Sequence, residues 1–208
     1  MKKQIKIFVI AAFALLCGSN VIAQDLSQAG ELYNNAATAL NEGNSQVALD
    51  GFKQALAAAE ALGEEGAALA TDCKNIIPKI YIQLGKEAAS NKDMDKAAEL
   101  LGQANKLATE YGQTEVAASA KETLTQVLIA DGNSLLNEKK YAEAIASYTK
   151  ATELDPANGV AYLRIGMCKG ASGDEQGAIE AYNKAAENGQ EANAKKQMGN
   201  IYAKKAVA

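Results

Sequence analysis

Residues 125–158 read TQVLIADGNSLLNEKKYAEAIASYTKATELDPAN, and this stretch decides the fold. Apolar residues recur at helical spacing on both sides of the turn at residues 137–140, and Asp155-Pro156 ends the second segment. Gly132 lies in the first segment, and Ala144 and Tyr148 lie in the second. Two antiparallel helices approach closely where one offers a Gly or Ala and a large side chain of the other fills the space beside it. The stretch therefore predicts a helical hairpin.

The same pattern occurs three more times in the chain. The small residue of the first segment recurs as Ala36, Gly85, Gly132 and Gly166, and the small residue of the second segment follows 12 positions later as Ala48, Ala97, Ala144 and Ala178. A large residue then follows (Phe52, Leu101, Tyr148, Tyr182), and after it a further alanine (Ala55, Ala104, Ala151, Ala185). Unrelated alanine-rich helices would not keep this register, so we expect a repeat array. The predicted repeats are 29–62, 78–111, 125–158 and 159–192, with a closing helix at 193–203.

The spacing of the copies predicts two long helices. The second-segment alanines are separated by 49, 47 and 34 residues, and the extra residues, 63–77 and 112–124, have helix-forming composition. We therefore expect elongated first helices in the second and third copies. Pro78 lies inside the first of them and has no backbone N–H, so we expect a kink or a break there. Ser45, Asp93 and Asp174 are the expected N-caps of second helices.

This arrangement resembles the tetratricopeptide repeat (TPR) family over about residues 29–190. The resemblance implies an all-α, right-handed solenoid of helix-turn-helix repeats, in which first helices line a concave groove that binds a peptide or helix. The residues that match the groove positions of the family are Lys79, Ile82, Lys86, Gln126, Ile129, Asn133, Val160, Leu163 and Met167. Asn133 matches one member of the cationic clamp that some relatives use for a terminal carboxylate, but Ile129 stands where the first lysine belongs, so we do not expect that clamp. The apolar members could instead be core, and the sequence leaves both readings open.

The first 23 residues have the pattern of a secretory signal peptide. Lys2, Lys3 and Lys6 precede the apolar run 7–16, and small residues near Ala23 suit cleavage after it. Acylation of Cys17 is the alternative, although Leu16 is unusual before a lipidated cysteine. We therefore predict an exported protein, periplasmic or secreted, with no transmembrane segment in the mature chain.

The charged and reactive residues exclude several functions. Loss of residues 1–23 would remove three lysines and change the formal charge from −4 to −7, and Arg164 is the only arginine, so nucleic acid is not an expected partner. The absence of histidine removes the usual nucleophile–base pairs and histidine metal sites. Cys73 and Cys168 lie in different repeats and are expected to be buried thiols. We predict no enzyme, cofactor or metal.

The sequence thus predicts a non-catalytic interaction scaffold of a bacterial cell envelope, which binds a protein or peptide partner. The alternative is a self-associating structural protein, with a homodimer formed through the closing helix. That helix is basic, with Lys195, Lys196, Lys204 and Lys205 in or beside it. These lysines either form a solvated capping face or contact an acidic partner or membrane surface.

Overall fold

The computed structural model describes residues 20–207, and it consists of helices and turns. Most of the predicted signal peptide, residues 1–23, and Cys17 lie outside this range, so the structure does not test them. The elements in chain order are α1 (Asn20–Asn41), α2 (Ser45–Ala61), α3 (Ala67–Ser90), α4 (Met94–Glu110), α5 (Thr114–Asn137), α6 (Tyr141–Leu154), α7 (Gly159–Ala171), α8 (Glu175–Ala185), the kinked turn η1 (Ala186–Gln190) and α9 (Glu191–Val207). They form two compact units that divide after Ala120.

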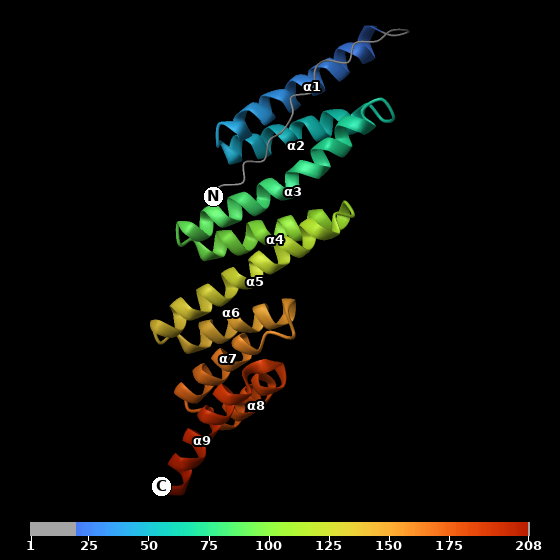
Figure 1. The fold of residues 1–208 in the computed structure, drawn as a ribbon. Coiled ribbons are helices and arrows are strands. Elements are labelled where there is room, and N and C mark those ends of the chain that lie inside the picture. Colours follow the sequence, from blue (N-terminus) through green and yellow to red (C-terminus); the bar gives the residue numbers. More distant parts are fainter. Residues whose placement is uncertain (1–19, 208) are drawn as a thin grey trace. The chain divides into compact units, whose positions relative to one another are not determined.

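Within each unit, consecutive helices pair as hairpins (Figure 1). In residues 20–120, α1 packs on α2 and α3 on α4, and α2 contacts α3. In residues 121–207, α7 packs on α8, α6 contacts α7, and α8 contacts α9. The first helices of the second and third hairpins, α3 and α5, have 24 residues each. The predicted all-α repeat fold with two elongated repeats is therefore confirmed.

The repeated small and large residues form the core, as expected. The eight second-helix alanines are all 0% exposed: Ala48, Ala55, Ala97, Ala104, Ala144, Ala151, Ala178 and Ala185. A Cβ built on Gly132 would lie 2.6 Å from Tyr148 Cε1, and one on Gly166 would lie 2.5 Å from Tyr182 Cε1. Each tyrosine ring therefore lies directly against the backbone of the first helix, where only glycine leaves room.

Of the kink or break expected at Pro78, the break is wrong, because α3 is continuous through this residue. Proline cannot donate to the carbonyl four residues earlier, which belongs to Lys74. Gln113 supplies the missing donor from the turn before α5: its Nε2 donates to Lys74 O at 2.7 Å. The helix tolerates Pro78 because this side chain replaces the lost backbone hydrogen bond.

Two of the three predicted caps are confirmed. Asp93 accepts from the backbone N–H of Lys96, and Asp174 accepts from that of Gly177. Ser45 is not a cap, since Asn44 precedes the first turn of α2. Ser45 is instead buried, 3% exposed, and its hydroxyl donates to Glu87 Oε1 at 3.0 Å, so it links α2 to α3.

Candidate protein-binding surfaces

The nine predicted groove residues lie on three first helices. Lys79, Ile82 and Lys86 are on α3, in the first unit, whereas the other six are on α5 and α7, in the second unit. On α3, both lysines are exposed, but Ile82 is only 8% exposed and belongs to the core. This helix therefore offers two separate cations and no apolar contact at the predicted positions.

On α5, the three predicted residues have different surroundings. Gln126 is exposed, and Ile129 is half-buried against a cluster formed by residues of α6, α7 and α8. Asn133 is half-buried, and its Oδ1 accepts a hydrogen bond from the Tyr148 hydroxyl at 2.8 Å. Within the described residues the Nδ2 group of Asn133 makes no hydrogen bond, so its two donors stay available.

On α7, the apolar positions divide between surface and packing. Leu163 and Met167 pack against a cluster that contains Tyr182 of α8 and Ala194 of α9. Val160 is 41% exposed, which makes it one of the few exposed large apolar residues of the described chain. The closing helix thus shares in covering Leu163 and Met167, and Val160 remains open.

Arg164 is a surface residue of α7 that was not among the predicted groove positions. It is half-buried and forms no ion pair within residues 20–207; its Nη1 lies 3.8 Å from Met167 Sδ. Burial raises the pKa of Tyr148 to about 12, and the nearby Arg164 guanidinium opposes this shift. The sequence signal was present, since this is the only arginine of the chain.

We call the surface formed by Gln126, Asn133, Val160 and Arg164 the α5/α7 face. Its two helices are adjacent, because Ile129 of α5 packs against the cluster that includes Ile165 and Cys168 of α7. Asp131, on α5, accepts a hydrogen bond from the Ser147 hydroxyl and forms no ion pair with Arg164 within the described residues. The α5/α7 face therefore combines an exposed apolar side chain, free amide donors and an unpaired cation.

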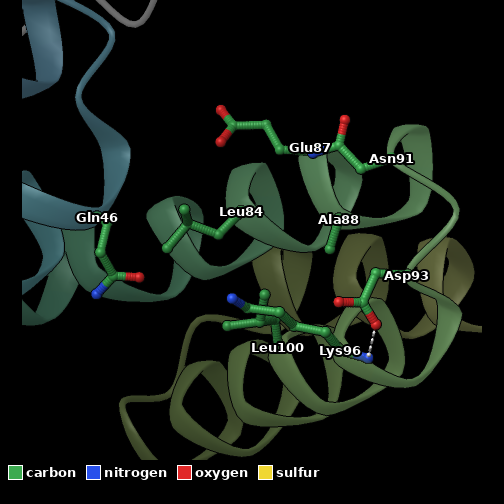
Figure 2. Close-up of a pocket in the computed structure, with 8 residues that line it drawn as sticks. All are labelled: Gln46, Leu84, Glu87, Ala88, Asn91, Asp93, Lys96 and Leu100. Atoms are coloured by element: carbon green, nitrogen blue, oxygen red, sulfur yellow. Dashed lines mark hydrogen bonds between the residues drawn. The ribbon is translucent and has the colours of Figure 1, made fainter.

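A second surface feature is a shallow depression of about 270 Å³ in the first unit. Figure 2 shows its lining, which comes from α2, α3, α4 and the turn between α3 and α4: Gln46, Leu84, Glu87, Ala88, Asn91, Asp93, Lys96 and Leu100. Both of its carboxylates are already engaged, Glu87 by Ser45 and Gln83, and Asp93 by the N-terminus of α4. The depression contains none of the nine predicted residues.

The reactive groups have the properties of packing residues. Burial raises the pKa of the Cys73 thiol to about 12, and burial also raises the pKa of the Cys168 thiol. Both cysteines are buried and unpaired, as predicted. A thiol with a raised pKa is a poor nucleophile because little thiolate forms at neutral pH.

Metal-binding clusters and membrane-spanning helices are absent from the described residues. Residues 20–207 contain no group of three or more acidic or cysteine side chains placed to hold a metal ion. No helix in this range combines the length and the apolar content that a bilayer span requires.

Comparisons with known proteins found similar solved structures over most of the chain and a family model in its C-terminal part. No curated protein matches the chain significantly. Among solved structures, "MamA RS-1 ArsTM double mutant" is similar at 20% identity and a TM-score of 0.39, with 86% of this chain and 85% of that one covered. "Crystal structure of YrrB: a TPR protein with an unusual peptide-binding site" is similar at 19% identity and a TM-score of 0.34, covering 89% and 98%. "MamA 41-end from Desulfovibrio magneticus RS-1" has 16% identity and a TM-score of 0.31, covering 79% and 96%.

None of these matches indicates an enzymatic family. The family model described as "Tetratricopeptide repeat" matches residues 135–203, from the last residues of α5 into α9, and this part of the chain is therefore similar to tetratricopeptide repeats.

Proposed function

We propose that the protein is a non-catalytic scaffold of a bacterial cell envelope, which binds a peptide or helix of a partner protein on the α5/α7 face. The observation that carries this proposal is Arg164, a half-buried cation with no carboxylate partner within the described residues. A partly desolvated charge is costly unless it is paired. A carboxylate of the partner would form a charge-assisted, bidentate pair with this guanidinium.

The neighbours of Arg164 define the rest of the ligand. Val160 precedes it by one helical turn, so an apolar side chain of the partner can pack there while an acidic one reaches Arg164. The free Nδ2 donors of Asn133 suit a backbone carbonyl or a second carboxylate oxygen. A partner segment with acidic and apolar side chains on adjacent turns fits this surface.

The partly buried residues of α7 limit the contact. Leu163 and Met167 already pack with α8 and α9, so they are less available to a partner than Val160 and Arg164 are. The binding surface is therefore more polar than the apolar groove that the sequence suggests. A polar, partly charged surface favours a binding strength that depends on salt.

The cellular location is part of the proposal and follows from the leader-like residues 1–23. We expect export and cleavage after Ala23, which leaves Gln24 as the first residue. N-terminal sequencing of the protein from the native envelope fraction tests this. A chain that keeps its initiator methionine and stays in the cytoplasm would refute export. A lipid-modified Cys17 as the first residue would replace cleavage after Ala23 by lipid anchoring.

Co-purification from the native envelope fraction tests the binding surface. Wild-type protein is compared with V160E, R164E and, as a control with the same charge reversal, K150E, which changes an exposed lysine on α6. We expect the first two variants to lose, by about tenfold or more, a partner that the wild type and K150E retain. Equal capture by all four folded proteins would rule out the α5/α7 face.

A further inference from the structure

Helix α9 has the residue pattern of a first helix. Ala194, Met198 and Gly199 of α9 follow Ala161, Ile165 and Gly166 of α7 at a constant interval of 33 residues. Ala161 and Ala194 are both 0% exposed. Met198 and Ile201 pack against α8 residues, in the way that a first helix packs on the second helix before it. The closing helix is therefore related to α7 in register as well as in position.

In α7, the side that carries Gly166 is covered by α8. Tyr182 lies over Gly166, and a Cβ on Gly170 would contact Ala178 Cβ at 3.6 Å. Because the two helices are antiparallel, Tyr182 lies over Gly166, and Ala178, four positions earlier, lies over Gly170, one turn further along α7. This pair of contacts joins the two helices of the last hairpin.

The corresponding side of α9 is uncovered in the described chain. Gly199 and Ala203 are exposed, and a Cβ on Gly199 would meet nothing within 4 Å. Tyr202, on the same side, is 55% exposed. Glycine inside a helix costs about 1 kcal/mol relative to alanine, and no contact within the described residues accounts for Gly199. We call this surface, formed by Gly199, Tyr202 and Ala203, the open face of α9.

The charge around the open face selects the kind of helix that can bind. Helix α9 contains four lysines and one glutamate. Lys195 pairs with Glu191, and Lys205 pairs with Glu175 of α8. Lys196 and Lys204 are exposed and form no ion pair within residues 20–207. A second α9 would bring further lysines to this surface, whereas an acidic helix would neutralise them.

We propose that the open face of α9 binds an acidic amphipathic helix of another protein, which takes the place that α8 takes on α7. The bound helix carries a large apolar residue over Gly199 and a small residue four positions earlier over Ala203. This surface is separate from the α5/α7 face, so the two proposals stand or fall independently.

The probe for this interaction is a peptide of residues 174–187, DEQGAIEAYNKAAE, with blocked ends, a fluorescent label and a hydrocarbon staple on its outward face. It carries the Ala178–Tyr182 pair in its native helix and a net negative charge. Fluorescence anisotropy of the labelled peptide is titrated with the full chain at low and high salt. We expect binding that weakens at high salt.

The decisive variant is G199L, since a side chain there projects onto the open face from a position where a Cβ meets nothing within 4 Å in the described chain. Its control is G102L, at a glycine of α4 where a Cβ also meets nothing within 4 Å. We expect G199L to weaken peptide binding by about tenfold or more, and G102L to bind as the wild type does. Circular dichroism verifies that both variants fold.

Three outcomes would overturn the proposal. They are no peptide binding by the wild type, equal binding by G199L and the wild type, and a dimer in analytical ultracentrifugation that G199L abolishes. The last outcome would assign the open face to a second copy of the chain.

Discussion

Replacing a helical glycine by alanine usually stabilises a protein, but the packing of Tyr148 on Gly132 predicts the opposite. A Cβ at Gly132 would lie 2.6 Å from Tyr148 Cε1 and 2.8 Å from both Cδ1 and Cζ. The ring cannot move away easily, because it is 0% exposed and its hydroxyl donates to Asn133. The change G132A should therefore destabilise the protein.

The magnitude follows from two opposing effects. Replacing a helical glycine by alanine stabilises the helix by about 1 kcal/mol. Forcing a methyl group into a packed core costs about 1–3 kcal/mol. We expect G132A to lower the free energy of unfolding by about 1 kcal/mol. The control G102A adds a methyl group to a helix where nothing lies within 4 Å, so it should raise that free energy by about 1 kcal/mol.

Thermal and urea unfolding followed by far-UV circular dichroism measure both variants. For a chain of this size, a difference of about 2 kcal/mol between them corresponds to about 4–8 °C in Tm. The double variant G132A/Y148L should recover part of the loss from Y148L alone, because leucine is smaller than the ring that the methyl group meets. If G132A proved as stabilising as G102A, the ring would not lie against the α5 backbone.

Two further predictions concern polar groups of the core. Replacing Gln113 by leucine should lower the free energy of unfolding by about 1–3 kcal/mol, because Lys74 O loses its donor. In a P78A background the backbone N–H returns, so the same replacement should cost less. An equal cost in both backgrounds, measured by urea unfolding, would contradict this role of Gln113. Burial raises the pKa of Tyr33 and Tyr148 to about 12 from 10.0, so the folded state holds protons that the unfolded state has lost between these values. The free energy of unfolding should therefore be unchanged below about pH 10 and fall as the pH rises towards 12. Y148F should make this fall less steep in unfolding curves measured over a pH series. An unchanged slope of unfolding free energy against pH would show that folding does not raise the pKa of Tyr148.

The repeat fold was predictable because its determinants are local and periodic. Glycines and alanines at a fixed spacing report close helix packing, and the same register in four copies makes chance agreement implausible. The lengths of α3 and α5 followed from the extra helix-forming residues between copies. Asp93 and Asp174 were recognisable as caps because the capping bond spans only three residues.

Contacts between distant residues were not predictable in the same way. Nothing in the sequence near Pro78 shows that Gln113, 35 residues later, supplies a donor to Lys74 O. The hydroxyl of Ser45 could equally have capped α2, and its use by Glu87 depends on how α2 and α3 pack. For the candidate site, the family positions identified the helices. They did not show that Leu163 and Met167 pack against residues of α8 and α9, because this contact depends on where the closing helix lies.

The most direct test of the binding proposal is site-specific photo-cross-linking in the native cell. A benzophenone amino acid replaces Val160 on the α5/α7 face or, as control, Lys150 on α6. We predict a defined adduct with an envelope protein from position 160, which is lost when R164E is added, and no such adduct from position 150. Adducts from position 150 alone, or an adduct at 160 that R164E leaves unchanged, would contradict it.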